Sequence, residues 1–251
     1  MTNSQPPIWQ IAFRPFFLGA SIFITLAFIL WALLLSNILP TLLGNYQPYG
    51  GWFNWHSHEM IFGFVQAVAI GFLLTASRNW AGHDGISPTA IKILTSSWLL
   101  ARLAWLTPET PAFIVAALDT TTPLLAALGL AQTLRGGERD HGKGSQRHNW
   151  PFVGLMITFA LVQLFFHQLL SSAPQHLPLL MQASVLIMAA MTLWVSGRVL
   201  PFFTRARLQT APPVIPSWLL RISMSSSWLL IPSLILSQIF KEVYGLALLT
   251  A

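Results

Sequence analysis

The fold of this chain is decided by residues 55–76, which read WHSHEMIFGFVQAVAIGFLLTA. Residues 61–76 are mostly Phe, Gly, Val, Ala, Ile and Leu, which is typical of a helix that spans a membrane. At the mouth of this run stand two imidazoles and one carboxylate, those of His56, His58 and Glu59. Ionisable side chains at the edge of hydrocarbon are costly, so they indicate a functional site.

The composition excludes a soluble protein. The chain has 251 residues, of which 54% are hydrophobic and 8% are charged, whereas soluble domains carry about 25% charged residues. Cysteine is absent, which excludes disulfides, thiolate metal sites and cysteine catalysis. The net charge of +6 does not indicate nucleic-acid binding, because the basic residues follow the pattern of membrane loops.

The apolar runs predict an all-α transmembrane helix bundle. We expect seven spans, at residues 16–39, 55–76, 91–106, 111–134, 150–170, 178–200 and 218–240. Each is predicted to be a helix because a single segment in lipid must satisfy its own backbone hydrogen bonds. Residues 243–251 are apolar but too few to cross a bilayer, which favours a partial eighth span over an ordinary hydrophobic end. The sequence thus predicts one transmembrane domain over residues 1–251, the N-terminal part of a longer protein.

The basic residues predict the orientation of these spans. Eleven of the thirteen Lys and Arg residues fall on one side, and only Arg102 and Lys241 belong to the other. Because cytoplasmic loops carry an excess of Lys and Arg, this split places the N-terminus in the cytoplasm.

Small residues recur every four positions in the second span, at Gly63, Ala67 and Gly71. Such a pattern lets the backbone of another helix approach closely. We therefore expect this face to pack against a neighbouring span.

Three more ionisable residues fall within spans rather than in loops. His167 lies near the outer end of the fifth span, Arg102 in the outer part of the third and Asp119 in the outer half of the fourth. A carboxylate at that depth must be paired or protonated, and Arg102 is its natural partner. This pair either has a purely structural role or anchors a group nearby.

The histidines are the candidate metal ligands. Imidazoles on facing helices of a bundle can hold haem iron and also suit copper, although a buried histidine can simply be hydrogen-bonded across helices. If the second helix begins before residue 56, His56 and His58 point about 200° apart and cannot chelate one ion. If residues 55–58 are extended, both could face one site. Gln163 lies four residues before His167 and shares its helix face.

Several motifs are similar to those of the NnrS family of bacterial membrane proteins. They are FRPFFLG at residues 13–19, WHSHEMIFG at 55–63, GFLLTA at 71–76, NWAG at 79–82 and GRVLPFFT at 197–204. The resemblance implies a haem- and copper-containing protein of the inner membrane that is associated with nitric oxide and nitrosative stress. It implies no known catalysed reaction. Members of the family have about twelve spans, of which this chain would supply roughly the first seven.

Our hypothesis from the sequence is therefore a membrane protein of the nitric oxide response that binds haem and also copper. His58 and His167 are the candidate axial ligands of the haem iron, and His56 is a copper ligand or supports one. Three further residues would tune the charge nearby, namely Glu59, Arg102 and Asp119.

Two other hypotheses stay open. Gly-rich helices and outer carboxylates could form the substrate path of a multi-span transporter. The chain could also be a non-catalytic assembly or sensor subunit without haem. The sequence assigns neither a reaction nor an oligomeric state.

Overall fold

The computed structural model describes residues 6–140, 146–208, 216, 218 and 222. Within these residues all regular structure is helical, which confirms the predicted all-α class. The chain divides into two compact units, Met1–Leu177 and Pro178–Ala251. The predicted seventh span and the partial eighth lie outside the described residues, except for residues 218 and 222.

The first unit holds all the helices that matter for the candidate site. They are α1 (Phe13–Leu35), α2 (Ile38–Leu43), α3 (Trp52–His58), the π-helical segment Glu59–Val65, α4 (Gln66–Ala81), α5 (Pro88–Trp105), α6 (Ala112–Asp140) and α7 (Pro151–Ser172). Short 3₁₀ turns lie at Pro7–Trp9 and Pro174–His176. The second unit is represented by α8 (Leu177–Leu208), which begins at the last residue of the first.

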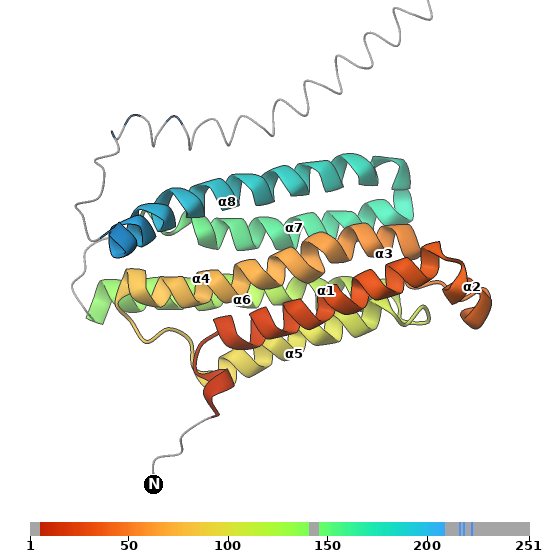
Figure 1. Cartoon of the computed structure of the whole chain (residues 1–251), viewed down its shortest axis with the longest axis horizontal. Helices are drawn as coiled ribbons and strands as arrows, with labels where there is room; N and C mark the ends of the chain where they lie inside the picture. Colours follow the sequence, from red (N-terminus) through yellow and green to blue (C-terminus); the bar gives the residue numbers. More distant parts are fainter. Residues whose placement is uncertain (1–5, 141–145, 209–215, 217, 219–221, 223–251) are drawn as a thin grey trace, which may run out of the picture. The chain divides into compact units, whose positions relative to one another are not determined.

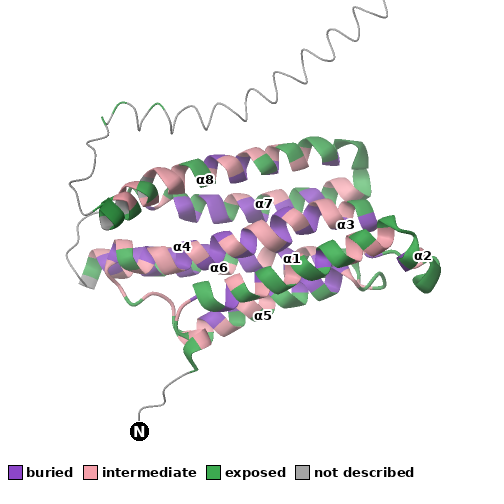
Figure 2. Cartoon of the chain, in the orientation of Figure 1, coloured by how far each residue is buried: buried purple, intermediate pink, exposed green. Residues whose placement is uncertain are grey.

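The long helices of the first unit run side by side (Figure 1). α4 packs against α1 and α6, and α6 packs in turn against α5 and α7. The continuous helix from Trp52 to Ala81 is the most buried of the helices that could span a membrane. In its most apolar stretch of 18 residues, 56% of the residues are buried. Figure 2 shows the same contrast, with α4 largely buried and α1 largely exposed. Residues 55–76 thus belong to the most buried of the helices that could span a membrane.

α1 turns most of its apolar side chains outward. Leu18, Ile22 and Leu26 are each more than half exposed, although their helix is strongly apolar. Large apolar patches on a protein surface mark contact with another apolar phase, and here that phase is the lipid of a bilayer.

Five of the described helices are long and apolar enough to cross a membrane. They correspond to the first, second, fourth, fifth and sixth predicted spans. The third predicted span forms α5, but this helix is not among the five. α5 has 18 residues, or about 27 Å, and it carries Lys92 and Arg102. The chain is therefore a multi-pass membrane protein, and the count of seven spans stays a prediction.

The first span ends earlier than predicted. The apolar run predicts a span that continues to residue 39, whereas α1 ends at Leu35. The cause is Asn37, whose φ of 62° places it in the left-handed region, where the chain cannot continue the helical ladder of hydrogen bonds. A separate helix, α2, begins at the next residue.

The predicted close packing on the small residues of the second span is confirmed. A Cβ atom added at Gly71 would lie 2.8 Å from Cβ of Phe16 on α1. Since Phe16 Cβ is fixed to the backbone of α1, the two helices can approach this closely only because residue 71 has no side chain.

Replacing Gly71 by alanine is expected to lower the free energy of unfolding by about 1–3 kcal/mol, because the added methyl group pushes α1 away. Thermal unfolding of the protein in detergent measures this effect. The matched control is Gly154→Ala on α7, where an added Cβ has nothing within 4 Å. That change should raise the free energy by about 0.5–1 kcal/mol, as alanine does in a helix interior. Equal midpoints for the two variants would contradict close packing at Gly71.

Candidate metal centre

The candidate centre begins where α3 meets the π-helical segment. His58 is the last residue of α3 and Glu59 is the first of the π segment, and both are fully buried. A π turn is rare and is often found at functional sites. Trp98 on α5 donates its indole N–H to the carbonyl oxygen of Gly63, at 2.9 Å. The π segment is therefore held by a side chain from a neighbouring helix.

Gly63 makes room for a buried ion pair. A Cβ atom at this position would lie 2.6 Å from Glu59 Oε2 and 3.0 Å from Arg102 Nη1. Arg102 places its Nε 3.1 Å from Glu59 Oε2, and its Nη2 donates to Oδ1 of Asp119 on α6. The predicted pairing of Arg102 with Asp119 is confirmed, and Glu59 is a second partner that the sequence analysis did not assign.

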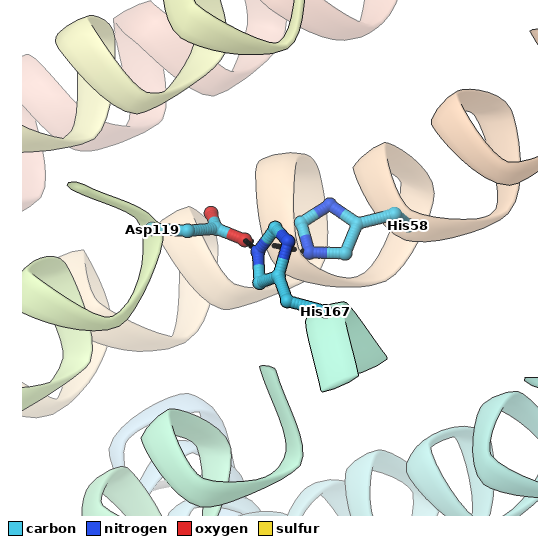
Figure 3. Close-up of side chains that lie close together, drawn as sticks. All are labelled: His58, Asp119 and His167. Atoms are coloured by element: carbon cyan, nitrogen blue, oxygen red, sulfur yellow. Dashed lines mark hydrogen bonds and ion pairs between the residues drawn. The ribbon is translucent and has the colours of Figure 1, made fainter. Parts of the chain in front are cut away.

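Two imidazoles converge on the other oxygen of the same aspartate (Figure 3). Asp119 Oδ2 lies 2.7 Å from His58 Nε2 and 3.1 Å from His167 Nε2. These three atoms lie within 4.8 Å of one another. The side chains come from α3, α6 and α7, so the centre forms only when three separate helices pack together.

His58 lies between two carboxylates. Its Nδ1 is 3.1 Å from Glu59 Oε1, and its Nε2 faces Asp119. A neutral imidazole has one N–H. If Nδ1 donates to Glu59, then Nε2 presents a lone pair to a carboxylate oxygen. This close approach of two acceptors is stable only with a proton or a metal ion between them.

The charges of the centre also require a proton or a metal ion. Glu59 and Asp119 are fully buried and contribute two negative charges, while Arg102, also buried, contributes one positive charge. With neutral imidazoles the cluster has a net charge of −1. A buried uncompensated charge is very costly, so the cluster needs one more positive charge, as a proton or as a metal cation.

Aromatic rings enclose the centre. The His58 ring stacks on Trp105, with ring centroids 4.3 Å apart, and it also contacts Phe62 and Phe166. All three aromatic residues are fully buried. They exclude water, which strengthens every electrostatic interaction between the polar groups.

Tyr49, in the loop before α3, packs against the centre. Its ring is 5.1 Å from Trp105 and 5.7 Å from His167, measured between centroids. Burial, and secondly the negative charge of Asp119, raise the pKa of the Tyr49 hydroxyl. The tyrosine therefore stays neutral and covers the centre with an uncharged group.

His56 is not brought to this centre. α3 begins at Trp52, so the helix does start before residue 56 and the two histidines point apart, as predicted for that case. The His56 ring stacks on Trp31 of α1, with centroids 4.0 Å apart and an interplanar angle of 11°. A role of His56 in metal binding stays a prediction.

Sequence reasoning missed the π segment and the packing of Trp105 on His58. No residue pattern predicts a π turn, and a tryptophan at the end of a span is equally typical of a membrane-interface anchor. The pairing of Arg102 with two carboxylates could have been predicted from the sequence. Glu59 and Asp119 are both expected near the same end of the bundle as this single arginine. Gln163 lies on the face of His167 as predicted and is fully buried, with no hydrogen-bond partner for either amide atom among the described residues.

Comparison with known protein families identifies a match. The family model described as NnrS protein matches residues 7–251. No curated protein and no solved structure matches the chain. The family model covers nearly the whole sequence. This agrees with the family motifs, which run from residues 13–19 to residues 197–204. The chain therefore belongs to the NnrS family.

Proposed function

We propose that this protein binds a transition-metal ion at His58, Asp119 and His167 and serves the bacterial response to nitric oxide from within the inner membrane. The observation that carries the proposal is the convergence of two imidazole nitrogens on one carboxylate oxygen from three helices. The association with nitric oxide comes from the family resemblance. The N-terminus would lie in the cytoplasm, as the distribution of Lys and Arg predicts.

The residues fit a bare ion. Metal ions bind imidazole and carboxylate at about 2.0–2.2 Å, so neighbouring ligand atoms of a tetrahedral site lie about 3.3–3.5 Å apart. The separations from Asp119 Oδ2, at 2.7 and 3.1 Å, need only small movements to reach these values. Glu59 on the Nδ1 side of His58 supplies the carboxylate that commonly orients a ligating histidine.

The same residues do not fit haem iron ligated by both imidazoles. A porphyrin would have to separate the two rings, but both Nε2 atoms lie against the same oxygen of Asp119. Trp105 also covers one face of His58. We therefore propose an ion, and not haem, between His58 and His167, and a haem bound by this protein would take other ligands.

Copper is the ion that agrees best with the donor set. Imidazole ligands suit copper, and copper is one of the two metals that the family resemblance implies. A monovalent ion would also cancel the net charge of −1 on the buried cluster. When bound, copper would supply a redox-active site for a small ligand, while Glu59 and Arg102 hold His58 and Asp119 in place.

Purified protein is expected to contain copper in stoichiometric amount and to lose it when either histidine is replaced. Elemental analysis after copper loading and desalting measures this for the wild type, His58→Ala and His167→Ala. The physical reason is that each replacement removes one of two nitrogen donors, and two remaining ligands hold an ion weakly.

The controls are His56→Ala and His176→Ala, which change histidines outside the cluster and should leave the copper content unchanged. An optical spectrum of the same samples tests haem, since a Soret band that survives both ligand replacements places haem elsewhere in the protein. Metal-free wild-type protein would contradict the proposal, and colourless vesicles with substrate-dependent flux would favour a transporter instead.

A further inference from the structure

A cleft lies between α6 and α7 in the outer part of the bundle. It has a volume of about 390 Å³, and the residues that line it include Tyr49, Phe113, Ala116, Ala117, Leu164 and His167. On α6 it covers the first nine residues, from Ala112 to Thr120. Nine residues of helix extend about 13 Å, so the cleft extends from the helix ends into the depth of the membrane.

The rim of the cleft is apolar and open to the outside of the bundle. Phe113 is 74% exposed and Leu164 is 53% exposed, and both belong to helices that are apolar and long enough to cross a membrane. Ala117, which also lines the cleft, is exposed as well. In a bilayer this rim faces lipid chains rather than water.

Two hydroxyl groups of the walls already donate hydrogen bonds to the backbone. The Thr120 hydroxyl donates to the carbonyl oxygen of Ala116, at 2.8 Å. The hydroxyl of Ser171 donates to the carbonyl oxygen of Gln168, at 3.0 Å. Such walls offer little to an anion or to a hydrated ion, which would lose its water without replacement. They suit a small uncharged molecule.

The inner end of the cleft is the metal centre itself. His167 lines the cleft, and its Nε2 lies 3.1 Å from Asp119 Oδ2. Its Nδ1 is buried without a hydrogen-bond partner among the described residues. An unpartnered buried polar atom is costly, so this side of the imidazole is a place where a ligand group can bind. His58 and Asp119 are fully buried, which leaves His167 as the side of the centre that meets the cleft.

We propose that the α6–α7 cleft binds a small uncharged ligand of the metal centre, which enters sideways from the lipid and reaches the ion beside His167. The inference rests on the proposed metal site and adds the route and the chemical class of its ligand. Diatomic gases belong to this class, because they dissolve in hydrocarbon and fit between small side chains.

Filling the cleft tests the route. Ala116→Phe places an aromatic ring in the cleft between α6 and α7 without replacing a proposed ligand. Carbon monoxide is the probe, added to the full chain loaded with copper and reduced, and its association is followed by infrared absorption. We expect association to slow roughly tenfold, because the ring must move aside before the gas can pass, which corresponds to a barrier higher by about 1.4 kcal/mol. The copper content should stay at the wild-type level.

The matched control is Ala90→Phe. Ala90, on α5, is also a partly buried alanine, but it lines a different cleft of about 180 Å³ between α5 and α6 that contains no residue of the centre. Wild-type association rates are expected for this variant. If Ala116→Phe does not fold, Ala117→Leu gives a milder obstruction of the same cleft.

Two rim variants test the direction of entry. Ala117→Trp obstructs the lipid-facing rim and is expected to slow carbon monoxide, whereas Ser171→Trp obstructs the rim at the end of α7 and is expected to leave the rate unchanged. The reverse result would overturn entry from lipid. Equal rates for Ala116→Phe and Ala90→Phe, with copper intact, would overturn the cleft as a route but leave the metal site standing. Absence of copper from the wild type would instead remove the metal site.

Discussion

Asp119→Asn is expected to abolish copper binding and to lower the free energy of unfolding by about 1–3 kcal/mol, because the hydrogen bonds from Arg102 and the imidazoles lose their charged acceptor. The amide keeps the size of the side chain but removes its charge. Arg102 then keeps only Glu59 as a partner, and the two imidazoles lose the oxygen on which they meet. Elemental analysis and thermal unfolding of the apoprotein in detergent measure the two effects separately.

The control for this experiment is Asp84→Asn, which makes the same chemical change at an exposed aspartate. It should alter neither the copper content nor the unfolding midpoint. Asp119→Asn protein that retains stoichiometric copper would remove Asp119 from the ligand set. Retained stability would mean that the contacts of the Asp119 carboxylate with Arg102 and the histidines add no net stability to the apoprotein.

Arg102→Met is expected to act in opposite directions on the apoprotein and on metal binding. Without metal, Glu59 and Asp119 lose the cation between them, which should destabilise the fold by about 3–5 kcal/mol. With metal, the bound ion no longer has a positive charge nearby. At a separation of about 5 Å and an effective dielectric constant of about 20, this repulsion is worth about 3 kcal/mol, or roughly a hundredfold in Kd.

The measurement is the increase in the unfolding midpoint when copper is added, which should be larger for Arg102→Met than for the wild type. The double variant Glu59→Gln/Arg102→Met restores the charge balance and is expected to recover much of the lost apoprotein stability. If copper raises the unfolding midpoint of Arg102→Met less than that of the wild type, the prediction is wrong. Arg102 would then favour copper binding by holding the ligands in place, and this effect would exceed its repulsion of the ion.

Polar residues in apolar runs were the part of the site that could be predicted from the sequence. His58, Arg102, Asp119 and His167 each fall in the outer part of a different predicted span, and these four side chains meet in the folded bundle. The inference works because a membrane interior makes buried charge so costly that ionisable groups must find one another. Their role as metal ligands or supports stays a prediction.

The details that could not be predicted depend on helix phase and on packing. His56 has the same residue type as His58 and the same depth, yet it stacks on Trp31 of α1, because two residues along a helix point in nearly opposite directions. The early end of α1 depends on a single left-handed residue, Asn37. A hydropathy pattern predicts neither the direction of the His56 side chain nor the end of α1, because both depend on backbone angles and not on polarity.

The π segment changes the direction in which side chains point before and after it along the helix from Trp52 to Ala81. It contains one residue more than the α-helical turn it replaces, and one residue corresponds to about 100° of rotation. Had the helix been regular from Trp52 to Ala81, setting Gly71 against α1 would also have dictated the direction of His58. The extra residue shifts that direction, so Gly71 after the π segment lies against α1 while His58 before it faces Asp119.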